Sequence, residues 1–134
     1  MSERTLVRVS DIMDDNYALL DGLATVQEVL LLMRERGPIP VIVDKRDDDD
    51  EYGIVVLSDI SKEVLAKDRS PERVNVYEIM TKPLVPVSPN MNVRYCARLL
   101  ERLSISGAPV MQQGKIVGMI NYESLVLKGL LRMG

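Results

Sequence analysis

An internal repeat constrains the fold more than any other feature of this sequence. A tripeptide ending in Ile-Met occurs at residues 11–13 and again at 78–80, and Thr-Val at 25–26 is matched by Asn-Val at 92–93, in both cases 67 positions later. Two further matches follow in the same order, with small shifts that indicate insertions in the loops: Pro-Val at 40–41 and 109–110, and Gly-Ile-Val at 53–55 with Gly-Met-Ile at 118–120. Four landmarks kept in order predict a duplicated unit of roughly sixty residues.

Each copy is predicted to fold as β-α-β-β-α. In the first copy, Thr25 and Glu28 have the spacing of a capping box, apolar residues then recur at helical spacing, and Gly37-Pro38 ends the helix. The next segments are predicted to be a short apolar strand, a charged hairpin connection, a return strand and a second helix, at 39–43, 44–51, 52–57 and from Asp59 onward.

The second copy follows the same pattern. Pro83, Pro86 and Pro89 restrict its lead-in to extended or edge backbone, because proline cannot donate a hydrogen bond to a sheet. We then expect a helix at 92–103, a strand at 108–111, a tight turn at Gln113-Gly114, a strand at 116–121 and a leucine-rich helix at 123–132.

The repeat also predicts the domain organisation. We expect an α/β (α+β) protein with one repeat at 9–67, a polar linker at 68–75 and a second repeat at 76–132. Two helices cannot cover both faces of a three-stranded sheet, so the two copies should pack sheet to sheet with pseudo-twofold symmetry, as one compact module.

Residue content argues against most enzyme chemistry. The 134 residues include no histidine and only one cysteine, so the chain lacks an imidazole base, a zinc ligand set and a Cys/His dyad, and it has no glycine-rich phosphate loop. We therefore expect no enzyme, no catalytic residues and no metal site. A net charge of −3 without a basic cluster argues against nucleic acid. A lone cysteine and the lack of any apolar run long enough to span a bilayer favour a cytoplasmic protein without membrane contact.

On these motifs, the chain resembles a tandem pair of CBS (cystathionine β-synthase) domains, often called a Bateman module. The resemblance rests on Asp-Ile-Met, Thr-Val-x-Glu, an apolar strand headed by proline, and Gly-Ile-Val-x-x-x-Asp-Ile, each of which has a second, looser copy, and all of which follow the family's order. It covers residues 9–131. The individual motifs are weak, and the ordered duplication makes the match specific.

The resemblance implies a regulatory module that binds an adenosyl ligand and carries out no chemistry. Such modules commonly form disc-shaped homodimers and bind AMP, ADP or ATP as regulatory ligands in clefts between the repeats; no cofactor is required, and the regulated partner protein is unknown. In the family, a cleft takes a ribose-binding acid from the last helix of one repeat and adenine-binding strands from the other. Carried over to this sequence, the first cleft would use Asp59, Thr81, Val85, Ile105, Ser106 and Pro109. A weaker second cleft would use Asp14, Ala18, Arg36, Gly37, Pro40, Asn121 and Ser124.

The two clefts differ at the ribose position. Asp59 can accept hydrogen bonds from both ribose hydroxyls, and its charged hydrogen bonds are stronger than those of the single hydroxyl of Ser124. Val56, however, stands where the family usually has Ser or Thr. The first cleft is therefore the better candidate, although it also departs from the family pattern.

Several residues also have a simpler structural interpretation. Asp59 could be an ordinary helix cap, or Ser58 could cap the helix and leave the carboxylate to a ligand. The acidic run 47–50 is expected to be a solvated loop, because it lacks the spacing and glycine of a calcium loop. Cys96 is expected to be a buried, inert thiol. Ligand phosphates could meet Lys62, Arg69 or Arg73, which could equally be surface charges.

The alternative function is a ligand-free dimerisation or scaffold module. Val56, Asn121 and Ser124 favour it, because they depart from the ligand-binding pattern. Dimerisation is expected under either function, since the leucines of the first and last helices extend around more of each helix than one core face requires.

Overall fold

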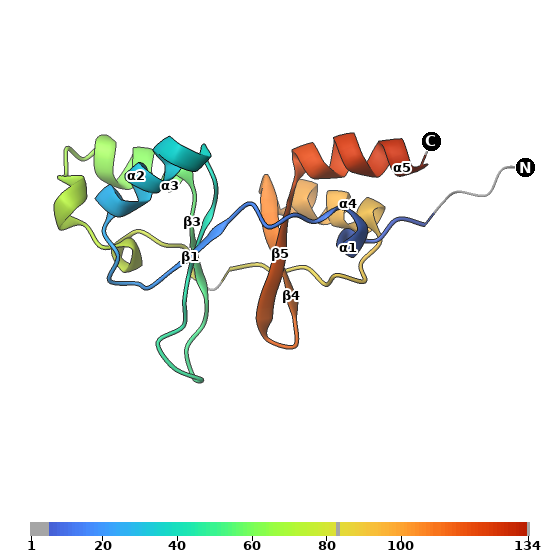
Figure 1. The fold of residues 1–134 in the computed structure, drawn as a ribbon, viewed down its shortest axis with the longest axis horizontal. Coiled ribbons are helices and arrows are strands. Elements are labelled where there is room, and N and C mark those ends of the chain that lie inside the picture. Colours follow the sequence, from blue (N-terminus) through green and yellow to red (C-terminus); the bar gives the residue numbers. More distant parts are fainter. Residues whose placement is uncertain (1–5, 83, 134) are drawn as a thin grey trace, which may run out of the picture. The chain divides into compact units, whose positions relative to one another are not determined.

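The computed structural model describes residues 6–82 and 84–133, which divide into two compact units. We call Asn16–Leu84 the central unit, and the residues up to Asp15 together with those from Val85 onward the terminal unit. Figure 1 shows both.

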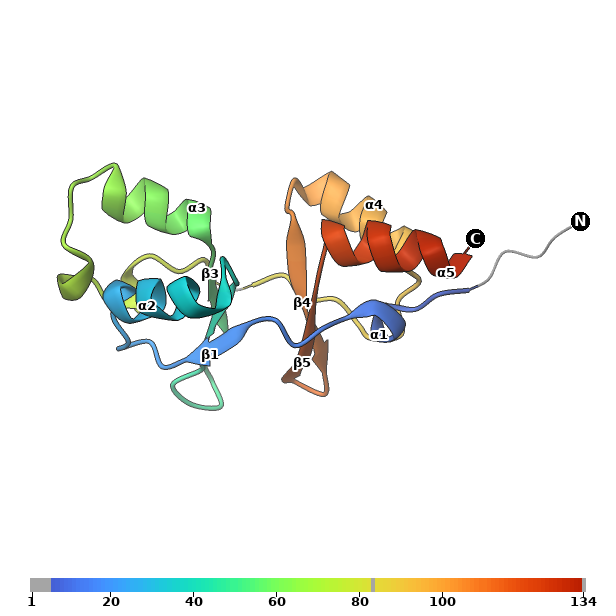
Figure 2. The same cartoon turned by 45° about the horizontal axis from the view of Figure 1, so that its top comes forward.

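The central unit contains a three-stranded sheet and two helices. In chain order it runs through β1 (Ala18–Leu20), α2 (Val26–Arg36), β2 (Val41–Val43), β3 (Gly53–Val55) and α3 (Leu57–Ile60), which continues as the π-helical segment η1 (Ser61–Leu65). β1 pairs with β2 in parallel and β2 pairs with β3 in antiparallel fashion. Figures 1 and 2 show α2 and α3 on one side of this sheet. The predicted β-α-β-β-α order is confirmed, although β2 and β3 are shorter than expected.

Two short 3-10 helices complete the central unit. η2 (Pro71–Arg73) lies in the segment expected to be a linker, and η3 (Val76–Glu78) follows it. Between and around them, Val74, Val76 and Ile79 are buried in the same core as Val26, Val41 and Val55. The chain after the first repeat therefore completes the core of the central unit.

The terminal unit repeats the pattern with a smaller sheet. It contains α1 (Val9–Ile12), α4 (Val93–Leu103), β4 (Gly107–Gln112), β5 (Lys115–Asn121), the π-helical segment η4 (Ser124–Leu130) and α5 (Leu131–Met133). β4 and β5 are antiparallel and are joined by the predicted turn at Gln113-Gly114, where both residues have positive φ. In place of a strand equivalent to β1, the terminal unit has a single parallel bridge between Val87 and Val110. The nearby Pro86 and Pro89 lack the N–H donors that a longer strand would need.

Local sequence signals explain where the long helices begin and end. Thr25 and Glu28 form the predicted capping box, with hydrogen bonds of 2.9 and 3.2 Å between each side chain and the other residue's backbone amide. The Asn92 side chain accepts from the Arg94 amide at the start of α4. Gly37 ends α2 with φ of 87°, and the corresponding end of α4 has Ser104 at φ 55°.

No helix among the described residues has the length and apolar character needed to cross a bilayer.

Each unit takes its core from both sequence repeats. Val9 and Ile12 of the first repeat are buried in the terminal unit with Val93, Leu100 and Ile120. In the same way, Ile79 of the second repeat is buried in the central unit. The Ile-Met motif at the start of each repeat thus packs with the helices and strands of the other repeat.

In each unit, the segment contributed by the other repeat places a methionine against a strand glycine. A Cβ atom added to Gly53 would stand 2.5 Å from Sδ and 3.3 Å from Cβ of Met80, and one added to Gly118 would stand 2.8 Å from Sδ of Met13. The two contacts with Sδ are closer than a Cβ atom normally approaches, so Met80 and Met13 would have to shift to admit one. The repeated glycine of the Gly-Ile-Val motif therefore leaves room for the repeated methionine of the Ile-Met motif.

We predict that Gly53→Ala lowers the free energy of unfolding by about 1–3 kcal/mol, because the added methyl group overpacks the contact with Met80. Gly129→Ala is the matched control, since its Cβ would meet only Val93 Cγ2 at 3.9 Å. Urea denaturation followed by circular dichroism measures both. A Gly53→Ala protein as stable as the wild type would contradict the close contact, and adding Met80→Ala should restore part of the lost stability.

Candidate functional site

The start of α3 holds the carboxylate expected to bind ribose. Val56 is the N-cap residue, and its backbone amide donates to Asp59 Oδ2 at 2.8 Å. Asp59 is half-buried, and its second carboxylate oxygen is not part of this capping bond. The helix begins two residues earlier than expected, and Asp59 caps it, not Ser58. Asp59 thus performs a structural role while one oxygen stays outside that role.

The equivalent turn of the terminal unit is closed by Ser124 and Asn121. The Asn121 amide donates to Ser124 Oγ at 3.0 Å, the Ser124 amide donates to Asn121 Oδ1 at 2.9 Å, and the Ser124 hydroxyl reaches the Asn121 carbonyl at 3.0 Å. Ser124 is only 4% exposed. Its hydroxyl therefore both accepts and donates within its own turn, which leaves little for a ribose.

Thr81 and Asp14 occupy equivalent positions, one residue after the two Ile-Met motifs. Thr81 forms an isolated antiparallel bridge with Ile54 of β3, with both N–H···O distances 2.9 Å. Asp14 bridges Met119 of β5 at 3.0 and 2.8 Å. Each pairs with the strand that leads into one of the two helix starts described above. Thr81 lies beside Ile54 of β3, the strand before α3, and Asp14 lies beside Met119 of β5, the strand before η4.

The other members of the first predicted set lie in the terminal unit. Val85 is exposed, the Ser106 carbonyl accepts a hydrogen bond from the Tyr122 amide at 3.2 Å, and Ile105 follows the end of α4. Pro109 is buried in β4, and its carbonyl accepts from the Val87 amide at 2.9 Å. Pro109 therefore belongs to β4, the strand that pairs with β5, and Ser106 lies immediately before it.

The other members of the second set lie in the central unit, where they surround the start of β1 and the end of α2. The Ala18 amide donates to the Pro40 carbonyl at 3.1 Å, and Arg36 Nη2 donates to the Tyr17 carbonyl at 3.3 Å. Gly37 is the C-cap of α2. Each predicted set is thus divided between the two units.

Of the cations proposed for phosphate, Arg69 is already paired. Its guanidinium donates to Glu78 Oε1 at 3.0 Å. A hydrogen bond from the Asn75 amide and, to a smaller extent, one from Arg69 hold the pKa of Glu78 below its usual value. Arg69 therefore stabilises the turn before η3, whereas Lys62 and Arg73 are exposed.

The acidic hairpin loop is less uniform than the sequence indicates. Asp47, Asp48 and Asp49 are exposed, but Asp50 is largely covered and binds Lys82 and Arg46. Lys82 and then the Arg46 amide hold the pKa of Asp50 well below its usual range. No group of three potential metal ligands occurs among residues 6–82 and 84–133. The sequence could not reveal the ion pair, because its partners are 32 residues apart.

Cys96 is buried in the core of the terminal unit, as predicted. Burial raises the pKa of its thiol to about 11. A thiol with this pKa is almost entirely protonated at neutral pH and is a poor nucleophile. The structure therefore gives Cys96 a packing role.

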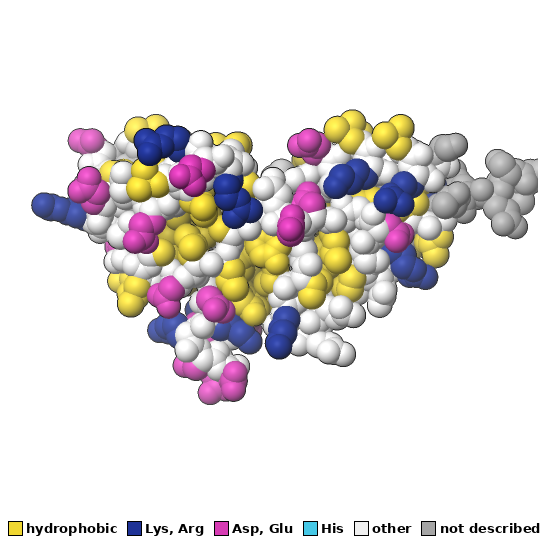
Figure 3. All heavy atoms as spheres, viewed as in Figure 1, with side chains coloured by type: hydrophobic (Ala, Val, Ile, Leu, Met, Phe, Trp, Pro, Cys, Tyr) yellow, Lys and Arg dark blue, Asp and Glu magenta, His cyan; other side chains and the backbone are white. Residues whose placement is uncertain are grey.

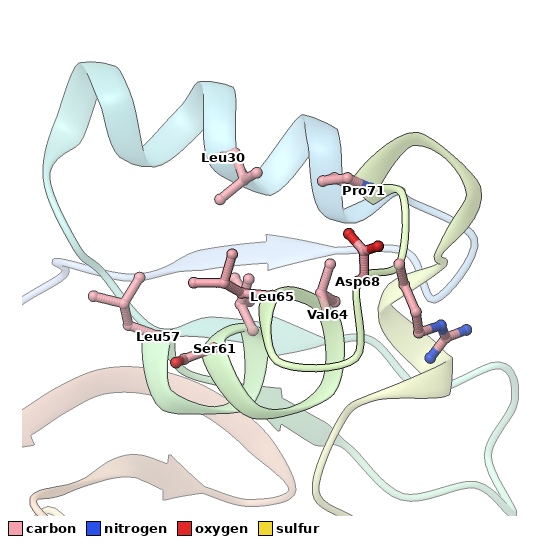
Figure 4. Close-up of a pocket in the computed structure, with 9 residues that line it drawn as sticks. Leu30, Leu57, Ser61, Val64, Leu65, Asp68 and Pro71 are labelled. Atoms are coloured by element: carbon pink, nitrogen blue, oxygen red, sulfur yellow. The ribbon is translucent and has the colours of Figure 1, made fainter.

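Both units carry an apolar pocket on their helices. In the central unit a pocket of 420 Å³ lies between α2 and the α3–η1 helix, where Leu30 faces Leu57, Val64 and Leu65 (Figure 4). In the terminal unit a pocket of 600 Å³ is lined by α4 and η4 residues such as Val93, Leu125 and Leu130. Neighbouring leucines are strongly exposed, with Leu65 at 77% and Leu131 at 80%.

The comparisons agree with the fold. The sequence profile of the CBS domain matches residues 9–66 and 76–129. The structure of a hexameric CBS-CP12 protein from bloom-forming cyanobacteria is 37% identical, with a TM-score of 0.86, over 92% of this chain and 72% of that one. The CBS domain pair of protein MJ0100, in complex with 5′-methylthioadenosine and S-adenosyl-L-methionine, superposes with a TM-score of 0.77 over 96% of this chain and 98% of that one. At 21% identity it shows a shared fold only.

The chain spans only part of the curated relatives it matches. It is 28% identical to the uncharacterized protein MJ0450 of Methanocaldococcus jannaschii over 81% of this chain and 59% of that protein. It is also 28% identical to a homoserine O-acetyltransferase of Methanosalsum zhilinae, over 89% of this chain but 23% of that enzyme. Because the CBS profile matches both repeats and covers most of the sequence, the chain belongs to the CBS domain family as a tandem CBS pair.

Proposed function

We propose that this CBS pair is a regulatory module that binds an adenosyl compound, with Asp59 as the ribose ligand, and signals to a partner protein. The observation that supports this most is the contrast between the two helix starts. Asp59 is half-buried and has one oxygen outside its capping bond, whereas the Ser124 hydroxyl is enclosed and satisfied within its own turn. We therefore expect one strong adenosyl site per chain, built on Asp59.

The choice of ligand class has two supports. A carboxylate that accepts two hydroxyl hydrogen bonds is suited to the cis-diol of a ribose. In addition, the CBS pair of MJ0100 holds 5′-methylthioadenosine and S-adenosyl-L-methionine on the same fold. AMP, ADP and ATP share this ribose and are included as candidates. No chemical step is proposed for the site.

Isothermal titration of the whole chain tests this function with 5′-methylthioadenosine, S-adenosylmethionine, AMP, ADP and ATP. We expect saturable binding of at least one compound near one site per chain. Asp59→Asn should weaken it by about tenfold or more, because hydrogen bonds to a charged acceptor contribute roughly 1.5–3 kcal/mol. Asparagine keeps an oxygen for the Val56 amide, so the helix cap is retained.

Asp47→Asn is the matched control, because it neutralises an exposed carboxylate that also accepts from a local amide. It should bind as the wild type does. Failure of all five compounds to bind below millimolar concentration, or equal affinity of the Asp59→Asn protein, would contradict the adenosyl site. The first result, in a protein that still assembles, would favour the alternative scaffold function.

We also propose that the chain assembles with copies of itself through the exposed leucines of η4 and α5. Exposed apolar patches of this kind mark interaction surfaces, and a CBS protein 37% identical to this chain is hexameric. The side chains concerned are among the most exposed large apolar residues described: Val126, Leu127, Leu130 and Leu131.

Light scattering of the wild type should give a mass above that of one 15.1 kDa chain. Leu127→Glu with Leu131→Glu should reduce that mass to a monomer without unfolding, because both side chains are exposed within the chain. Leu23→Glu, equally exposed but outside the helices, should leave the assembly intact. A monomeric wild type, or an unchanged mass in the double variant, would contradict this interface.

A further inference from the structure

A second pocket in the central unit lies at the carboxyl ends of the parallel strands β1 and β2. It has a volume of 530 Å³ and is formed by Asp21 and Leu23 after β1, by Asp44 after β2, and by Tyr77, Met80 and Lys82. It shares no residue with the adenosyl sets. Its size is that of an ordinary small-molecule site, and it lies at the carboxyl ends of parallel strands, where α/β folds often bind ligands.

Two carboxylates lie side by side at this edge. β1 and β2 are parallel with Leu20 opposite Val43, and the Asp44 amide donates to the Leu20 carbonyl at 2.8 Å. Asp21 and Asp44 therefore follow neighbouring strands at the same level. Backbone amides orient both side chains: the Leu23 amide donates to Asp21 Oδ1 and the Lys45 amide donates to Asp44 Oδ1, each at 2.8 Å.

The cations near the pocket are engaged with other groups. Lys82 and Arg46 both bind the covered carboxylate of Asp50. Lys45 lies over the Tyr52 ring, with Nζ 5.2 Å from the ring centroid. Figure 3 shows acidic and basic side chains gathered on and around the hairpin loop. The lining therefore holds three carboxylates, Asp21, Asp44 and Asp50, against the two cations Arg46 and Lys82, and keeps a net negative charge.

Apolar groups form the rest of the wall. Tyr77 is 50% exposed and Leu23 72% exposed, and Met80 also lines the pocket. A tyrosine ring face attracts organic cations, and a methionine thioether adapts to an apolar body. The pocket therefore combines fixed negative charge with an aromatic and apolar surface.

We infer that this pocket binds a small organic ammonium compound. The ammonium group lies between the carboxylates of Asp21 and Asp44, and the apolar part of the ligand covers Tyr77, Leu23 and Met80. This site is distinct from the adenosyl site, since the two share no residue.

The probe is benzylammonium chloride, titrated into the full ¹⁵N-labelled chain and followed by amide chemical shifts. We expect saturable shifts that are centred on residues 21–23, 43–46 and 77–82. Benzyl alcohol and benzoate, which have the same ring without positive charge, should bind at least tenfold more weakly. This comparison uses the wild type alone and does not depend on any variant.

The double variant Asp21→Asn, Asp44→Asn should lower the affinity for benzylammonium at least tenfold, because asparagine retains the oxygen that each backbone amide needs but removes the charge. Asp47→Asn is matched to it, since Asp47 Oδ1 accepts from the Asp49 amide in the same way, at 2.9 Å. It should leave the affinity unchanged. Absence of saturable shifts, equal binding of benzoate, or an unaffected double variant would each overturn the inference.

Discussion

The structure depends on a contact that occurs twice, in which a methionine side chain lies on a strand glycine. Met80 covers Gly53 and Met13 covers Gly118, and one residue later in each case the chain pairs with the same strand, through Thr81 and through Asp14. Each contact joins the start of one sequence repeat to the strands of the other. Neither repeat can therefore complete its core without a segment of its copy, which explains why two CBS repeats occur as a pair in this chain.

The same exchange places the functional candidates. Thr81 is held at β3 by its bridge, and β3 leads directly to the turn in which Asp59 caps α3. In the terminal unit the equivalent turn uses an uncharged, enclosed Ser124 with Asn121. The two repeats have equivalent positions here, and side-chain chemistry makes them unequal: one has a carboxylate with an oxygen outside its capping bond, and the other uses its hydroxyl for local structure.

Much of this could be predicted from the sequence, and the reasons are local. The order of elements, the Thr25–Glu28 capping box, the Gln113-Gly114 turn and the burial of Cys96 all follow from patterns within a few residues. The packing of Val74 and Ile79 into the central unit, the Lys82–Asp50 ion pair and the pocket at Asp21 and Asp44 depend on residues distant in sequence. The sequence allows either Ser58 or Asp59 to cap α3, because both are good capping residues, and the backbone geometry decides for Asp59.

Amide hydrogen exchange in the intact chain tests the segment exchange most directly. The amides of Ile54 and Thr81 donate to each other's carbonyls, as do those of Asp14 and Met119. If each repeat is completed by the other, the Thr81 and Asp14 amides should be protected as strongly as the core amides of β2 and α4. Exchange of Thr81 and Asp14 at the rate of exposed loop amides, with the strands still protected, would contradict this account.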